Sequence, residues 1–223
     1  MKNLLYLAVL AFIVSCSATK KTSVQVPHEQ RVMLTTDSGS MVIRLSNKTP
    51  LHRDNFVKLV KEHFFDSLLF HRVIRDFMIQ GGDPGSKHAR QGQLLGEGSL
   101  AYNIPAEFDT ALFHKKGALA AAREADSDNP TKKSSATQFY IVGGKTFTDA
   151  EMDKIEDKLH IKIPENHRLV YRTLGGTPFL DMNYTVFGEV ISGLDVIDKI
   201  ASAPTDGNDR PLKNIRMKIV MLK

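Results

Sequence analysis

The sequence contains no tryptophan and a single cysteine among its 223 residues. A single cysteine excludes an internal disulfide framework, so burial of apolar side chains must hold the fold together. Long hydrophobic runs are also scarce, and the longest, Leu4 to Val14, has eleven residues. As a helix this run would rise about 16 Å, which is too short for a hydrocarbon core of ~30 Å. The run is therefore interpreted as the apolar part of an export signal rather than as a membrane span.

Residues 1–15 are predicted to be a lipoprotein signal peptide. The segment begins with the positive charge of Lys2, and Cys16 follows the small residue Ser15 directly after the apolar run. It resembles bacterial lipoprotein signals, in which the cysteine is acylated and becomes the new N-terminus. We expect a lipid on Cys16 to tether the protein to the cell membrane, facing the periplasm. Residues 17–21 contain no acidic retention signal, which favours the outer membrane; a secretory signal without lipidation is the alternative.

Charge of one sign is not in large excess. The 30 Lys and Arg residues and 25 Asp and Glu residues give a net charge of +5, and the basic residues are scattered rather than gathered in a stripe. A nucleic-acid partner is therefore not expected. The eight histidines are dispersed without metal-ligand spacing, so no metal site is expected. No glycine cluster has the sequence context of a phosphate loop, so no cofactor is expected either. Nothing in the sequence signals oligomerisation, and a monomer is the expectation.

The chain is predicted to contain one folded domain, residues 31–223, behind a polar linker. Residues 16–30 lack apolar periodicity and are interpreted as a flexible, lipidated linker. The domain opens with two β-rich runs joined by a turn at residues 37–39, which is typical of a hairpin. Thr49 and Pro50 then predict the start of a helix, as N-cap and first helical residue.

Short strand-like segments fill most of the remaining domain. A second helix is predicted over 193–200, and a helical insertion over about 145–176, where Thr148 and Glu151 form a capping box. The insertion could carry a separate partner-binding role, although a charged helical face is more simply explained as solvated surface. Many short strands with two flanking helices favour a mostly antiparallel sheet or barrel. The predicted strands are 69–74, 77–80, 118–122, 138–142, 184–190 and 214–222.

One stretch carries a specific resemblance. Residues 70–83, Phe-His-Arg-Val-Ile-Arg-Asp-Phe-Met-Ile-Gln-Gly-Gly-Asp, resemble the cyclophilin signature almost position by position. Similar blocks follow in the family's order at 96–108, 117–123, 135–141 and 180–190. The resemblance covers the whole predicted domain except the insertion. It implies a mostly β fold: a closed eight-stranded antiparallel barrel with two capping α-helices, to which the helical insertion is added.

The resemblance also implies peptidyl-prolyl cis/trans isomerase activity on proline-containing polypeptide clients. Rotation about a peptide bond meets a barrier of ~18–20 kcal/mol, because resonance gives the C–N bond double-bond character. A catalyst needs no nucleophile here, but it must bind the twisted amide better than either planar form. Twisting localises a lone pair on the prolyl nitrogen, and Arg72, a permanently charged fork of donors, is the predicted catalytic residue. A non-catalytic module or scaffold that binds proline peptides is the alternative.

The other predicted site residues are expected to bind substrate. Gln80 and Gln138 would contact the substrate backbone through their amides. His71 is assigned a supporting role, because prolyl rotation transfers no proton. Phe179 stands where many family members carry a tryptophan that bonds cyclosporin, which predicts weak inhibition by that drug. The residues expected to surround the proline ring or to line its edge are Phe77, Met78, Ala122, Arg123, Phe139, Phe179, Leu180 and Tyr184.

Overall fold

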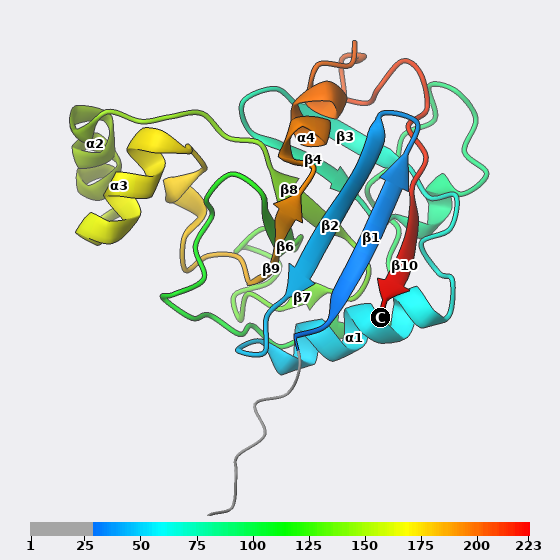
Figure 1. Cartoon of the computed structure of the whole chain (residues 1–223), viewed down its shortest axis with the longest axis horizontal. Helices are drawn as coiled ribbons and strands as arrows, with labels where there is room; N and C mark the ends of the chain where they lie inside the picture. The colour runs from blue at the N-terminus through cyan, green and yellow to red at the C-terminus, as the bar shows by residue number, and fades with distance from the viewer. Residues whose placement is uncertain (1–28) are drawn as a thin grey trace, which may run out of the picture.

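The structure is a computed structural model that describes residues 29–223 (Figure 1). The predicted signal peptide, Cys16 and nearly all of the predicted linker lie outside the described residues. Within residues 29–223, no helix is both long enough and apolar enough to cross a membrane.

Antiparallel strands make up most of the described chain. Eight of them form one sheet in the order β10-β1-β2-β9-β6-β8-β4-β3, and β5 pairs with β7 in a separate two-stranded sheet. The bounds are β1 (Arg31–Thr36), β2 (Gly39–Leu45), β3 (Phe70–Ile74), β4 (Met78–Gly81), β5 (Asn103–Ile104), β6 (Ala118–Ala121), β7 (Ser134–Ser135), β8 (Phe139–Val142), β9 (Val186–Ser192) and β10 (Lys218–Leu222).

The sheet is strongly curled but not fully closed, which corrects the predicted closed barrel. In the described part of the chain its two edge strands, β3 and β10, share no ladder of paired residues. The start of β3 and the residue before it instead meet the segment just ahead of β10: Leu69 and Arg216 form an isolated bridge, and the Phe70 N–H donates to the Ile215 carbonyl over 3.0 Å. Strand β10 pairs with β1 along its whole length, so the curl brings the two edges together only where β10 has not yet begun.

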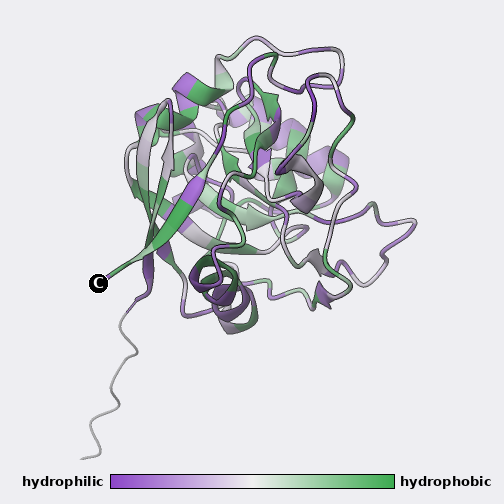
Figure 2. Ribbon diagram, turned by 90° about the vertical axis from the view of Figure 1, so that its right-hand side faces the viewer, coloured by the Kyte–Doolittle hydropathy of each residue, from purple (hydrophilic) through white to green (hydrophobic). Residues whose placement is uncertain are grey.

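The main core lies inside the curled sheet because alternate residues of each strand point inward. In the first hairpin, Val32 and Leu34 of β1 and Met41, Ile43 and Leu45 of β2 are all buried, and they alternate with more exposed neighbours. Figure 2 shows this mixture of hydrophobic and hydrophilic residues along the ribbon. The period-two pattern therefore defines the inner face of the sheet.

Two α-helices, α1 (Pro50–Lys61) and α4 (Leu194–Ala201), lie at opposite ends of the sheet, as predicted (Figure 1). Helix α1 does begin at Pro50, but the side chain of Thr49 forms no capping hydrogen bond with any described residue. The carboxylate of Glu107 takes that role, because it accepts the N–H groups of Leu51 at 3.0 Å and His52 at 2.9 Å. A distant loop therefore satisfies the free donors of this helix.

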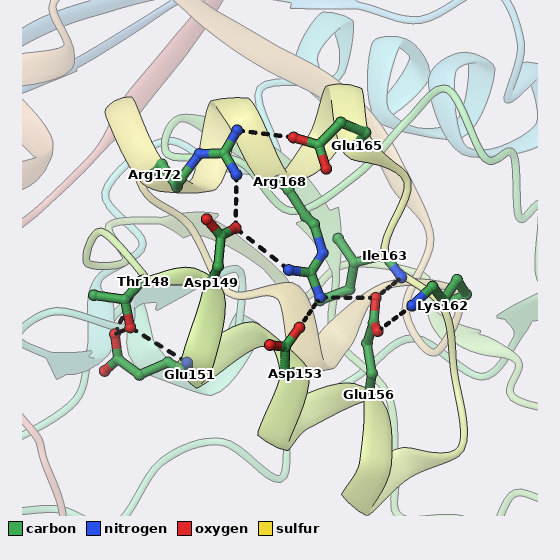
Figure 3. A network of polar contacts seen from close by, with 10 residues as sticks. All are labelled: Thr148, Asp149, Glu151, Asp153, Glu156, Lys162, Ile163, Glu165, Arg168 and Arg172. Carbon is green, nitrogen blue, oxygen red and sulfur yellow. Dashed lines mark hydrogen bonds and ion pairs between the residues drawn. The ribbon is translucent and has the colours of Figure 1, made fainter.

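The insertion folds as a pair of helices, α2 (Asp149–Leu159) and α3 (Glu165–Thr173), to one side of the sheet (Figure 1). The predicted capping box between Thr148 and Glu151 is present. Arg168 of α3 reaches acidic residues of α2, and this network of ion pairs holds the two helices together (Figure 3). The insertion also has a small core of its own: Phe147, Met152, Ile163 and Tyr171.

Short 3-10 turns complete the described elements. η1 (Pro84–Ser86) follows β4, and η2 (Pro178–Leu180) leads from the insertion back toward the sheet. η2 contains two predicted site residues, Phe179 and Leu180, so the position of this turn determines where both side chains lie.

Candidate active site

The β3–β4 hairpin brings the predicted catalytic residue beside a predicted substrate-binding residue. Arg72 on β3 is the cross-strand partner of Gln80 on β4, and its Nη1 donates to Gln80 Oε1 over 3.5 Å. The Asp209 carboxylate lies 3.7 Å from Arg72 Nε. The Arg72 side chain is still 44% exposed, so the guanidinium is oriented by its neighbours and remains open to a ligand.

A second hydrogen bond extends from Gln80 to the far side of the site. Gln80 Nε2 donates to Gln138 Oε1 over 3.1 Å. Gln138 Nε2 in turn donates to the carbonyls of Gly96 and Gly98, each over 2.7 Å. These hydrogen bonds fix the orientation of both amides: Gln80 turns its oxygen to Arg72 and its nitrogen to Gln138, and Gln138 turns its nitrogen to the glycine carbonyls.

A hollow of about 160 Å³ lies beside these hydrogen-bonded residues. Its lining is mixed, and we call it the apolar hollow after the apolar side chains that form part of its walls. Its floor belongs to a second apolar cluster on the outer face of the sheet, which includes Met78 and Tyr140. Most of the residues predicted to hold the proline ring meet here. The hollow is lined by Arg72, Phe77, Met78, Gln80, Ala122, Arg123, Tyr140, Leu180 and Tyr184.

Two neighbouring hollows share residues with the first. One, of about 230 Å³, contains His71 together with Arg72 and Gln80. The other, of about 270 Å³, contains Gln138 together with Gln80, Ala122 and Arg123. Because Gln80 lines all three hollows, they are adjacent, and we refer to them together as the groove around Gln80.

A larger hollow, of about 400 Å³, lies between the end of β2, β9 and residues 111–118. It contains none of the predicted site residues. Its charged rim is internally paired, since Glu189 forms ion pairs with both Arg44 and Lys115. We therefore place the candidate active site at the groove around Gln80, where open cationic and amide groups border an apolar surface.

His71 is buried, and its ring nitrogens form no well-formed hydrogen bond within residues 29–223. The pKa of His71 is lowered to about 4, chiefly by burial; the Asp83 carboxylate opposes this shift, and the positive charges of Arg72 and Arg210 contribute to it. The ring is therefore neutral near pH 7. A neutral, buried imidazole suits the supporting role predicted for this residue.

Phe139 does not lie in the groove, and its assignment to substrate binding is corrected. Its side chain is 1% exposed and packs edge-on against Phe56, Phe65 and Phe70 in the main core. The next residue, Tyr140, points to the other face of β8 and lines the apolar hollow. Period-two alternation from Gln138 would have identified Tyr140 in the sequence, because residues 138 and 140 share one face of the strand.

Phe179 lies at the edge of the groove rather than in the apolar hollow. It is 37% exposed, and its ring centroid is 5.9 Å from that of Phe77. The next residue, Leu180, does line the hollow. η2 therefore contributes one wall residue and one rim residue.

The Arg123 side chain borders the groove but is already paired. Its guanidinium stacks over the Tyr184 ring at 4.5 Å, donates to the Asn183 carbonyl over 2.8 Å and forms an ion pair with Asp126. Only 4% of the side chain is exposed. Arg123 thus fixes the loop that carries Tyr184, and its charge is not free to meet a substrate.

The described residues contain no group of His, Cys, Asp and Glu side chains placed to hold a metal ion. Beside the apolar hollow the groove offers the exposed guanidinium of Arg72 and the amides of Gln80 and Gln138. Such a set can bind and orient an extended peptide and stabilise charge on it. No activated nucleophile is part of it.

Comparison with known proteins agrees with this chemistry. The family described as "Cyclophilin type peptidyl-prolyl cis-trans isomerase/CLD" matches residues 31–221. A Staphylococcus haemolyticus protein named "Putative peptidyl-prolyl cis-trans isomerase" is 32% identical over 189 residues, which cover 84% of this chain and 88% of that protein. A Staphylococcus aureus protein of the same name is 33% identical over 188 residues, with the same coverage.

Solved structures match the fold. A crystal structure of a Cryptosporidium parvum cyclophilin type peptidyl-prolyl cis-trans isomerase has a TM-score of 0.63 at 22% identity, covering 88% of this chain and 99% of that one. A crystal structure with the same title, in the presence of the dipeptide Ala-Pro, has a TM-score of 0.61 at 23% identity and covers 87% and 99%. The chain belongs to the cyclophilin-type peptidyl-prolyl cis-trans isomerase family. The predicted family and enzyme class are confirmed.

Proposed function

We propose that this protein binds proline-containing segments of exported polypeptides in the groove around Gln80 and catalyses rotation about their X–Pro bonds. The observation that carries the proposal is the position of Arg72. Its exposed guanidinium is oriented by Gln80 and Asp209 at the border of an apolar hollow. A proline ring held in that hollow has its nitrogen at the polar border.

The chemistry follows from differential binding. Isomerisation needs the planar amide to twist, and the twisted form has a lone pair on the prolyl nitrogen that the planar forms lack. A guanidinium donor near that nitrogen stabilises the twisted form more than either isomer, so the barrier falls. Because its charge is permanent, Arg72 can do this across the pH range in which the protein is folded.

The remaining residues position the substrate. Gln80 presents a partly exposed amide that can pair with substrate backbone. Gln138 is buried and already donates both Nε2 hydrogens, so it can offer a substrate only its Oε1, and its hydrogen bonds fix the orientation of Gln80 in advance. Phe77, Met78 and Leu180 supply apolar walls for the ring. Burial of apolar surface supplies affinity, at ~25 cal/mol per Å² removed from water.

The proposed setting is the periplasmic face of a membrane, most simply the outer membrane. It is supported by the sequence of residues 1–15 and by Cys16, which resemble a lipoprotein signal. A polar linker, residues 16–30, would hold the domain away from the lipid. X–Pro isomerisation is slow enough to limit folding, and newly exported chains are therefore the proposed clients.

Cys16→Ser should move the protein from the membrane fraction to the soluble fraction and abolish labelling by a fatty-acid probe.

The test of the function is isomerisation by the wild-type protein. NMR exchange spectroscopy on several X–Pro peptides measures the rate and the peptide affinity in one sample. Acceleration of exchange supports the proposal. A folded protein that binds these peptides but leaves every exchange rate unchanged would be a binding module, and the proposal would be wrong.

A further inference from the structure

One carboxylate links the insertion to the apolar hollow. Asp181 directly follows Leu180, a wall residue of the hollow, and both of its carboxylate oxygens are engaged. Oδ2 accepts the Tyr171 hydroxyl over 2.7 Å. Oδ1 accepts the His114 backbone N–H over 2.8 Å and lies 2.9 Å from His114 Nδ1. Asp181 therefore joins helix α3, the segment before β6 and the end of η2.

The link continues to the floor of the hollow. His114 is fully buried, and its Nε2 lies 2.9 Å from the Tyr140 hydroxyl. A carboxylate can only accept, so His114 Nδ1 is the donor to Asp181. In the neutral ring Nε2 then accepts the Tyr140 hydroxyl proton, so the Nδ1–H tautomer satisfies both contacts. The orientation of the Tyr140 ring is in this way tied to Asp181.

The insertion is tightly packed around Tyr171, the residue that contacts Asp181. Tyr171 is fully buried in the insertion's own small core, and Phe113 packs against it edge-on at 5.5 Å. The chain returns from α3 through Gly176, where a Cβ atom would lie 2.2 Å from the His114 carbonyl and 2.6 Å from Tyr171 Cε1. The Thr177 N–H then donates to that same carbonyl over 2.8 Å. Only glycine allows so close an approach.

We propose that Tyr171, Asp181 and His114 are positioning residues for the apolar hollow, and that the insertion contributes to the site through the Tyr171 hydroxyl. Tyr171 fixes the Asp181 carboxylate. Asp181 then holds Leu180 at the wall and, through His114, the Tyr140 ring at the floor. This inference rests on the proposed function, because it assigns these residues to the same site.

The test is Tyr171→Phe in the otherwise intact domain. The substitution keeps the ring in its core and removes only the hydroxyl. Loss of a hydrogen bond worth about 1 kcal/mol should weaken binding of a proline peptide about fivefold. KM should rise by the same factor while kcat stays within about twofold, because Arg72 is untouched. Backbone hydrogen exchange should quicken at Asn183, whose N–H donates to Leu180, and stay unchanged in β1.

The matched control is Thr148→Ala, which removes the capping box of α2 and touches no member of the link. It should destabilise the insertion by a similar amount, about 1 kcal/mol, and leave peptide affinity and KM at wild-type values. Asp181→Asn is a second variant that keeps the shape of the side chain, and it should weaken peptide binding more than Tyr171→Phe does.

The outcomes separate the two claims. Wild-type peptide affinity and KM in both Tyr171→Phe and Asp181→Asn would overturn the positioning role, and so would an equal loss of affinity in Thr148→Ala. If the wild-type protein binds peptide without accelerating exchange, the proposed isomerase function fails. The peptide dissociation constants of the same variants then still decide whether the link positions the hollow.

Discussion

Gln80 and Tyr140 lie directly opposite each other in the ladder between β4 and β8. One supplies the amide that orients Arg72, and the other supplies the apolar floor of the hollow. Cross-strand partners on one face of a sheet are held about 5 Å apart by the ladder itself. The polar and apolar halves of the site are therefore kept in register by backbone hydrogen bonds.

The two aromatic residues at the start of β8 should respond differently to the same substitution. Tyr140→Leu removes the ring from the floor and should weaken proline-peptide binding about tenfold, a loss of ~1.4 kcal/mol of apolar and ring contact. Phe139→Leu should lower the thermal unfolding midpoint, since that ring is in the core, and leave the peptide dissociation constant unchanged. Titration of both variants by NMR checks this. Weaker binding in Phe139→Leu alone would reverse the assignment of the two faces.

Stability should depend on pH through His71. The ring takes up a proton near pH 6.5 in an unfolded chain, and in the folded protein its pKa is about 4. Between these values the unfolded state binds more protons, so the free energy of unfolding falls as the pH is lowered from about 6.5 to about 4. By linkage the loss is on the order of 3 kcal/mol. Burial also lowers the pKa values of His52 and His167, and both act in the same direction.

Denaturant unfolding at several pH values measures this dependence. His71→Phe should reduce the slope of stability against pH between pH 6.5 and 4, and the lowered pKa values of His52, His167 and carboxyl groups such as Glu151 and Glu156 should leave part of the slope in place. His88→Phe, at an exposed position, is the matched control and should leave the slope unchanged. A His71→Phe protein with the wild-type slope would contradict the buried, neutral state of this ring.

Cyclosporin should inhibit this protein weakly, because Phe179 has no indole N–H to donate. Phe179→Trp should tighten inhibition about fivefold, the equivalent of one hydrogen bond of about 1 kcal/mol. Isomerase activity should change little, since Phe179 sits at the rim and does not line the hollow. Inhibition constants of wild type, Phe179→Trp and Phe179→Leu measure this. Nanomolar inhibition of the wild type would refute the prediction.

Most of the fold could be predicted from the sequence, because its strands and turns have sequence patterns that depend only on nearby residues. The turn at Gly39, the alternation in β1 and β2 and the capping box at Thr148 each depend on a few neighbouring residues. The degree of closure of the sheet could not be predicted, since it depends on how the curl brings β3 and β10 together. The Glu107 cap on α1 could not be predicted either, because Glu107 is more than fifty residues away from the N–H groups that it accepts.

The candidate site was predictable to a similar extent. The signature stretch predicts Arg72, Phe77, Met78 and Gln80 as site residues, and the structure brings all four to one hollow. The motif alone misassigns Phe139, because neighbouring residues of a strand point to opposite faces and Tyr140, not Phe139, faces the groove. The contacts of Asp181 with His114 and Tyr171 left no local signal, since they join three segments that meet only in the folded chain.

The most direct test of the account compares Arg72→Ala with Arg75→Ala. Both arginines are exposed on the β3–β4 hairpin, but only Arg72 borders the hollow. NMR exchange on an X–Pro peptide should show that Arg72→Ala loses most of the wild-type rate, at least about tenfold, while it stays folded and still binds the peptide. Arg75→Ala should retain the wild-type rate. An Arg72→Ala protein that exchanges the peptide as fast as wild type would contradict the central claim that this guanidinium stabilises the twisted amide.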